Sequence, residues 1–136
     1  MKLSMIQNLA IWGDSLLKGI IFDEKTSRYK PLKTCSVNLF SKAFPFTVKN
    51  NSRFGCTAPK ALENLQASLN NGLQAEVALL EFGGNDCDYN WSEISRNPEA
   101  HHEPHTPFQT FCSTMEKMAD LLLFASDYLT IRMTEK

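Results

Sequence analysis

The sequence predicts an α/β protein, a three-layer α/β/α sandwich built on a parallel sheet. Three mostly apolar segments, 6–12, 46–48 and 77–82, have the composition and the length of buried strands. Segments with helical periodicity separate and follow them, which gives the order β-α-β-α-β-α. This order favours parallel strands joined by right-handed crossovers, so the loops that follow the strands meet at one edge of the sheet.

The first third of the chain contains one strand, one turn and one helix. The strand over 6–12 ends at a Gly-Asp-Ser turn, 13–15, and Asp and Ser are both favoured at the start of a helix. The segment 22–33 is polar and rich in turn-forming residues, so it is predicted to be an irregular excursion over the surface. Apolar residues at helical spacing over 37–44, closed by a proline, predict a short amphipathic helix.

The middle third repeats the strand, turn and helix order. The strand over 46–48 leads into a turn-rich stretch, 50–56. Thr57 is placed to cap the helix that follows, with Pro59 near its first turn, and an Asn-Asn-Gly sequence ends that helix. The strand over 77–82 is apolar almost throughout, which is typical of a central parallel strand covered on both faces.

The last third begins with a polar loop, 87–107, that holds every histidine of the chain. Thr106 is predicted to cap a long helix, with a glutamine three residues later to complete a capping box. The apolar side chains of this helix recur at helical spacing and are predicted to pack on the sheet: Phe108, Phe111, Met115, Met118, Leu122 and Ala125. Residues 128–131 are predicted to start a fourth strand.

Length and composition limit the classes of function. The 136 residues fit one domain, 1–136, and 43% hydrophobic with 21% charged residues is typical of a globular protein. A net charge of -1 creates no field that would attract nucleic acid, and no apolar segment is long enough to span a membrane. The first residues lack the apolar core of a signal peptide, and the four cysteines are widely spaced. We therefore expect a cytoplasmic protein with reduced thiols.

Three residues that follow predicted strands supply the chemistry of acyl transfer. Ser15 is the candidate nucleophile, because it is expected at the start of a helix at the rim of the sheet. Gly55 lets a backbone N–H approach a ligand, and Asn85 offers a side-chain amide to a developing oxyanion. The parallel topology is expected to place the three near one another. At this point the alternative is a structural one, in which Asp14 and Ser15 only cap a helix.

The residues around these positions carry a resemblance to a known family. The chain resembles the SGNH (GDSL-type) hydrolases in three blocks, which occur in the order of the family: Gly13-Asp14-Ser15-Leu16, Ser52-Arg53-Phe54-Gly55-Cys56-Thr57 and Gly83-Gly84-Asn85-Asp86. The resemblance implies a flavodoxin-like fold and a cofactor-free esterase, lipase or carbohydrate acetylesterase that acts on small-molecule or carbohydrate esters. It also implies that Ser15 is the nucleophile and that the backbone N–H groups of Ser15 and Gly55, with the Asn85 side chain, form the oxyanion hole.

One block of the family pattern is missing, the Asp-x-x-His that supplies the acid and the base of the triad. Asp127 is not followed by this motif, and no histidine comes after His105 in the sequence. We therefore expect a C-terminally truncated member whose fold is incomplete at that end. His101, His102 and His105 are candidate bases in the loop after the third strand, with a merely solvated loop as the alternative. Their spacing indicates no regular metal site, so no metal is expected.

Two functions from different classes follow from this pattern. The first is a serine ester hydrolase. The second is a catalytically impaired remnant that binds a ligand or a partner protein without turnover. A truncated sheet would expose a strand edge and apolar helix faces, which favours a homo-oligomer.

Overall fold

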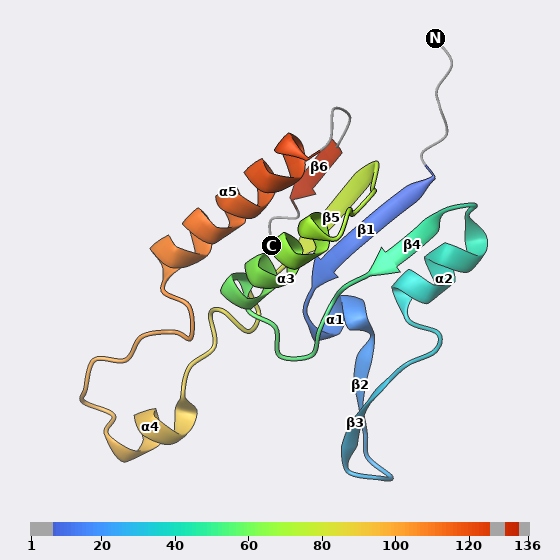
Figure 1. Cartoon of the computed structure of the whole chain (residues 1–136). Helices are drawn as coiled ribbons and strands as arrows, with labels where there is room; N and C mark the ends of the chain where they lie inside the picture. The colour runs from blue at the N-terminus through green and yellow to red at the C-terminus, as the bar shows by residue number, and fades with distance from the viewer. Residues whose placement is uncertain (1–6, 126–129, 134–136) are drawn as a thin grey trace.

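Four parallel strands form the central sheet, in the order β4-β1-β5-β6 (Figure 1). The strands are β1 (Asn8–Gly13), β4 (Thr47–Asn50), β5 (Val77–Glu81) and β6 (Thr130–Met133). The computed structural model describes residues 7–125 and 130–133. Numbered along the chain, the parallel strands take the order 2-1-3-4, which is the start of the flavodoxin-like order. The predicted parallel sheet is confirmed, and β6 includes the second half of the predicted fourth strand, whose residues 128 and 129 lie outside the described part.

Helices cover both faces of the sheet, which gives the three predicted layers (Figure 1). One face packs against α3 (Ala58–Asn70) and α5 (Phe108–Phe124), and the other packs against α1 (Ser15–Lys18) and α2 (Ser36–Ala43). Alternate residues of β1 serve the two faces, since Ala10 and Trp12 belong to the first cluster and Ile11 belongs to the second. This alternation follows from the two-residue period of a strand.

The cluster under α3 and α5 is the larger of the two. Its helical members include Leu65, Met118 and Leu122, which are almost completely buried. Removal of such a side chain from water stabilises a fold by about 1.5–3 kcal/mol. The predicted apolar stripe of α5 is correct except at its two ends. Phe108 is 76% exposed because α5 begins at this residue, before the part of the helix that reaches the core, and Ala125 is exposed just after the helix ends.

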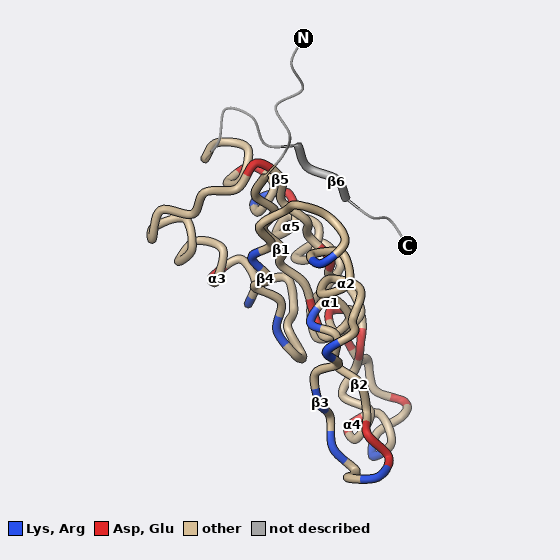
Figure 2. Tube along the Cα trace, turned by 90° about the vertical axis from the view of Figure 1, so that its right-hand side faces the viewer, with Lys and Arg blue, Asp and Glu red and all other residues tan. Residues whose placement is uncertain are grey.

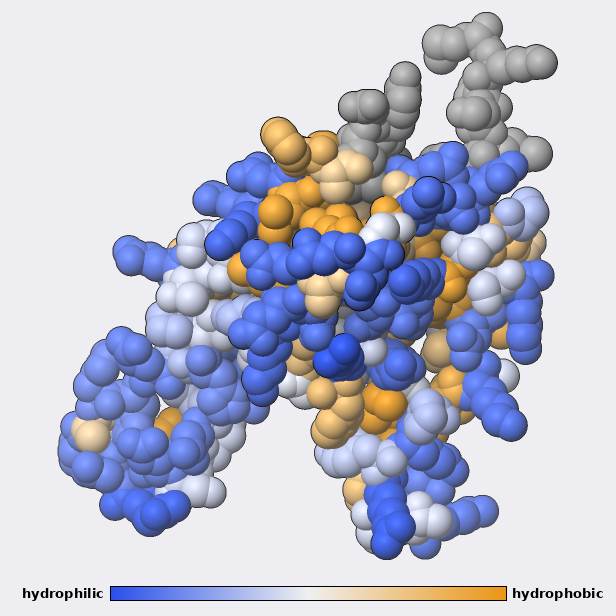
Figure 3. Space-filling view, in the orientation of Figure 1, coloured by the Kyte–Doolittle hydropathy of each residue, from blue (hydrophilic) through white to orange (hydrophobic). Residues whose placement is uncertain are grey.

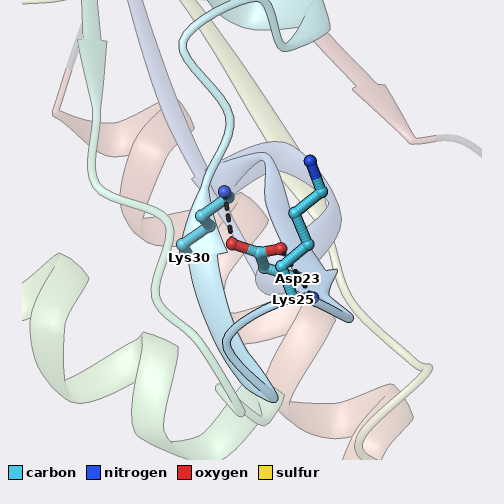
Figure 4. Close-up of polar contacts among 3 residues, drawn as sticks. All are labelled: Asp23, Lys25 and Lys30. Carbon is cyan, nitrogen blue, oxygen red and sulfur yellow. Dashed lines mark hydrogen bonds and ion pairs between the residues drawn. The ribbon is translucent and has the colours of Figure 1, made fainter.

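The predicted irregular excursion is wrong, because most of it forms an antiparallel hairpin of β2 (Ile20–Asp23) and β3 (Arg28–Pro31). At the far end of the hairpin, the Asp23 carboxylate accepts hydrogen bonds from Lys30 Nζ at 2.6 Å and from the Lys25 backbone N–H at 3.1 Å (Figure 4). The hairpin extends away from the sheet and carries several of the basic residues of the chain (Figure 2). Its strands are mostly exposed on both faces, so the sequence lacks the polar and apolar alternation by which strands are recognised.

Two predicted helix caps also differ in the structure. Thr57 occupies the cap position of α3, but its side chain makes no capping hydrogen bond. The Ala58 backbone N–H instead donates to the Asp86 carboxylate at 2.9 Å. Thr106 is buried and lies before Pro107, which is the cap residue of α5, so this helix begins without the predicted capping box.

The predicted polar loop contains a short helix, α4 (Trp91–Arg96), and stands apart from the sheet (Figure 1). Its two ends are joined by backbone hydrogen bonds from His105 N–H to Asp88 C=O at 2.8 Å and from Thr106 N–H to Asp86 C=O at 3.0 Å. We refer to residues 88–105 as the histidine loop. Among the helices of the described residues, none is both long enough and apolar enough to cross a membrane.

Candidate active site

The candidate site lies at the carboxyl ends of β1 and β5. Gly13 and Glu81, the last residues of these strands, are paired in the sheet. After β1 the chain forms β4 on one side of β1, and it later forms β5 on the opposite side of β1. The direction in which strands are added therefore reverses between β1 and β5. Open α/β sheets bind ligands outside the carboxyl ends of the strands at such a reversal.

Ser15 is the first residue of α1, directly after β1. Asp14 is the N-cap, and its buried carboxylate accepts a hydrogen bond from the Leu16 backbone N–H at 2.8 Å. The Ser15 side chain is half-buried, and within the described part of the chain neither its hydroxyl nor its backbone N–H has a hydrogen-bond partner. Ser15 therefore presents an unengaged hydroxyl and an unengaged donor at the rim of the sheet.

The second segment, which follows β4, lies directly beside the first. The Arg53 backbone N–H donates to the Gly13 C=O at 3.0 Å, which extends the contact between the two segments beyond the strands. Gly55 sits at the exposed tip of the following turn with φ +65°, a conformation that favours glycine. An added Cβ would meet no atom within 4 Å, so glycine is favoured here by the backbone conformation rather than by crowding within the protein.

Asn85 joins the three segments. Its Nδ2 donates to the Cys56 C=O at 3.1 Å and, over a longer 3.4 Å, to Asp14 Oδ2. The first, second and third sequence blocks are thus in contact through one side chain. The bond to Asp14 is the weaker of the two because its donor–acceptor distance is longer. A stronger acceptor could therefore replace Asp14 as the partner of this amide hydrogen.

Asp86 has a role at the site that the sequence analysis missed. Its side chain is buried, its Oδ1 accepts from the first residue of α3, and its backbone C=O accepts from Thr106. The carboxylate therefore connects the segment after β5 to the segment after β4. The sequence offers no direct signal for this bond, because the two partners are 28 residues apart. In addition, the sequence pattern already predicts Thr57 as the cap of this helix.

The three histidines lie within the last five residues of the histidine loop but make different contacts. His105 Nδ1 lies 3.2 Å from the Asn85 C=O, at the end of the loop next to the site. Earlier in the loop, His102 Nε2 contacts the Asn97 C=O at 2.8 Å, and His101 lies 3.6 Å from Glu103 in an exposed pair. No hydrogen bond joins Ser15 to any of the three in the described part of the chain.

Ionisation at the site involves one thiol and one carboxylate with shifted pKa values. Burial raises the pKa of the Cys56 thiol, and the positive charges of Arg53 and Lys60 only partly offset this effect. Cys56 therefore stays protonated at neutral pH and does not compete as a nucleophile. Hydrogen bonds from the Trp91 side chain and the Tyr89 backbone lower the pKa of Asp88. Within residues 7–125 and 130–133, no cluster of His, Cys, Asp and Glu could hold a metal ion.

Comparison with solved structures identifies the fold. AlinE4, an SGNH-hydrolase family esterase, is similar with a TM-score of 0.59 and 16% identity over 94% of this chain and 59% of that one. A lipase/acylhydrolase from Enterococcus faecalis is similar with a TM-score of 0.60 and 18% identity over 91% of this chain and 55% of that one. A carbohydrate acetylesterase family member from Sinorhizobium meliloti is similar with a TM-score of 0.60 and 18% identity over 87% of this chain and 54% of that one.

These similarities confirm the predicted SGNH-hydrolase fold. The chain spans 54–59% of the length of these solved structures. Sequence comparison finds no matching family model and no matching curated protein. The roles of Ser15, Gly55, Asn85 and the histidines stay predictions from the sequence, whereas the contact between the three blocks is a structural observation.

Proposed function

We propose that the protein hydrolyses carboxylic esters with Ser15 as the nucleophile. The Ser15 hydroxyl would attack the ester carbonyl, the alcohol would leave with a proton, and a water molecule would then release the acid from the serine. The observation that carries the proposal is the pair of Asn85 hydrogen bonds, which hold the segments of Ser15, Gly55 and Asn85 together at the carboxyl ends of the strands.

The oxyanion of this reaction would bind to three donors. Two are the backbone N–H groups of Ser15 and Gly55, which have no partner in the described part of the chain. The third is Asn85 Nδ2, which would exchange its long bond to Asp14 for the oxyanion. In comparable enzymes, loss of one such donor lowers kcat by about 10²–10³. The Asp14 carboxylate next to Asn85 opposes the binding of an oxyanion. This site therefore stabilises an oxyanion less than a site in which the asparagine amide has no carboxylate partner.

His105 is the best-placed candidate for the base. If its Nδ1–H donates to the Asn85 C=O, Nε2 retains the lone pair that accepts a proton. His102 contacts the Asn97 C=O and His101 lies beside Glu103, so within the described residues neither is bonded to a residue of the candidate site. For catalysis Nε2 of His105 must come within hydrogen-bond distance of Ser15, which requires a shift of the loop end.

The substrate that fits this surface is a small ester, including a carbohydrate ester, with an apolar group next to the carbonyl. Leu16 is 60% exposed and Phe54 is 58% exposed, and they adjoin Ser15 and Gly55 in the chain. In the space-filling view, hydrophobic side chains are visible at the base of the hairpin (Figure 3). The proposed chemistry uses no cofactor.

The test is hydrolysis of p-nitrophenyl acetate by the 136-residue chain and by its Ser15→Ala variant. We expect turnover that falls to background in the variant, together with fluorophosphonate labelling of the parent chain only. A His105→Gln variant should lose activity while His101→Gln keeps it, since only His105 adjoins Asn85. Equal rates for the parent and Ser15→Ala would contradict the proposal.

The second candidate function is ligand or partner binding without turnover. It is favoured by the absence of any hydrogen bond between Ser15 and a histidine in the described residues, because an unassisted serine hydroxyl is a weak nucleophile. Under this alternative the chain takes up no fluorophosphonate, and it still binds an ester analogue at the Ser15 surface.

A further inference from the structure

We infer that a polar cavity behind the candidate active site binds a small oxyanion, with inorganic phosphate or a phosphate monoester as the ligand class. The cavity has a volume of about 250 Å³. It lies between the end of α1, the segment after β4 and one side of α3, and its lining consists of Lys18, Asn50, Asn51, Ser52, Arg53, Asn64 and Ser68. This inference does not depend on Ser15 or on ester hydrolysis.

The charges of the lining favour an anion. Two lining residues are cationic, Lys18 and Arg53, and none of the others is acidic. Both cations have exposed side chains, so they are free to rearrange around a ligand at the mouth of the cavity. Arginine matches the geometry of a phosphate group with a bidentate hydrogen bond, and lysine adds a compact positive charge.

Two buried donors in the lining lack partners. Ser52 is only 1% exposed, and its Oγ has no hydrogen-bond partner, nor has the buried Nδ2 of Asn51. Buried polar groups are usually paired, so these two donors directly behind the cavity wall could donate to a ligand after a small shift of the lining side chains. A tetrahedral oxyanion has enough acceptor oxygens for the two cations and for either of these donors.

The part of the cavity formed by Asn50 is fixed before any ligand binds. The Asn50 side chain donates from Nδ2 to the Leu17 C=O at 2.9 Å and accepts at Oδ1 from the Ser52 backbone N–H at 3.0 Å. It therefore ties α1 to the segment that carries Ser52 and Arg53. At about 30 Å³ per water molecule, the cavity has the volume of about eight water molecules, which is enough for a small anion with an attached organic group.

The experiment is a titration of ¹⁵N-labelled protein with inorganic phosphate at constant ionic strength, followed by amide chemical shifts. We expect saturable shifts at residues 18 and 50–53. Arg53→Gln and Lys18→Gln should each weaken binding by at least about tenfold, since a hydrogen bond to a charged group contributes about 1.5–3 kcal/mol. Ser52→Ala should also weaken binding. Lys42→Gln on α2 is the matched control, because it removes the same charge outside the cavity, and it should bind phosphate like the parent chain.

Two further ligands identify the chemistry. Glycerol 3-phosphate that binds more tightly than inorganic phosphate would assign the cavity to phosphate monoesters, and equal or weaker binding would assign it to the free anion. Glycerol alone is expected to cause no shifts. The inference is overturned if glycerol reproduces the shifts, if the shifts do not saturate, or if Lys18→Gln and Arg53→Gln bind phosphate as well as Lys42→Gln does.

Discussion

Asp86 shows how a single residue supports the geometry around the candidate site. Its carboxylate binds the first backbone N–H of α3, and its own backbone C=O binds the segment that leads into α5. It also directly follows Asn85, whose amide contacts the other two sequence blocks. A change at Asp86 therefore affects the start of α3 and the position of Asn85 together.

We expect Asp86→Ala to lower the free energy of unfolding by about 1–3 kcal/mol, because the substitution leaves the Ala58 N–H without its acceptor. Thr57→Ala is the matched control. Thr57 stands at the cap position of the same helix but makes no capping bond, so its loss should cost less than about 0.5 kcal/mol. Urea unfolding measures both values, and an equal loss in the two variants would show that Asp86 does not cap α3.

At the scale of the elements, the histidine loop depends on a carboxylate with a lowered pKa. Asp88 Oδ1 accepts hydrogen bonds from Trp91 Nε1 at 2.8 Å and from the Tyr89 backbone N–H at 2.9 Å. These bonds favour the ionised form, so the pKa of Asp88 lies below its ordinary value of 3.8. The stability that these bonds contribute is fully present above the pKa of Asp88 in the unfolded chain. It is lost as the pH falls through the lower pKa of Asp88 in the folded chain.

Acid titration should therefore change the fluorescence of Trp91 below a pH of about 4, before or as the sheet unfolds. The exposed Trp91 responds to the loss of its hydrogen bond, whereas Trp12 is buried under α3 and α5. Asp88→Asn removes the titrating group and should abolish this step. A step of unchanged size in Asp88→Asn would assign the signal to another group.

The elements also show what sequence patterns can predict. Helices α2, α3 and α5 are predicted because each buries one face and therefore carries an apolar pattern of helical period. Strands β1 and β5 are predicted because both of their faces are covered, so their residues are apolar almost throughout. The β2–β3 hairpin and α4 were missed for the opposite reason. They are mostly exposed, and contacts between their own residues, such as the ring pair Phe22 and Tyr29, do not produce a period.

For the whole molecule, the two faces of the sheet differ in the size of their cores. Leu65 belongs to the large cluster under α3 and α5, and Val37 belongs to the small cluster under α2. We expect Leu65→Ala to lower the free energy of unfolding by about 2–5 kcal/mol and Val37→Ala by less than about 2 kcal/mol. Chemical denaturation tests this difference, and equal losses would show that both faces stabilise the fold to the same degree.

The topology explains why the contact between the three sequence blocks could be predicted without coordinates. A parallel sheet with a regular strand order brings the ends of β1, β4 and β5 together, so the predicted proximity of Ser15, Gly55 and Asn85 needs no detail of side-chain packing. The structure shows contacts between the three segments as the hydrogen bonds of Asn85 to Asp14 and Cys56. The Asp86 bond and the placement of His105 against Asn85 could not be predicted, because they depend on the path of long loops.

Two glycines with similar backbone conformations restrict the evolution of this chain in different ways. Gly19 has φ +71°, and a Cβ there would overlap the Cβ of Cys35, so any other residue would push the start of α2 away from α1. Gly55 has φ +65° but open space around it, so asparagine, which tolerates this conformation, could replace it without loss of the fold. A side chain at position 55 would stand where a ligand must approach the backbone N–H, so a substitution there can block the candidate site in a chain that still folds. A substitution at position 19 disturbs the fold itself.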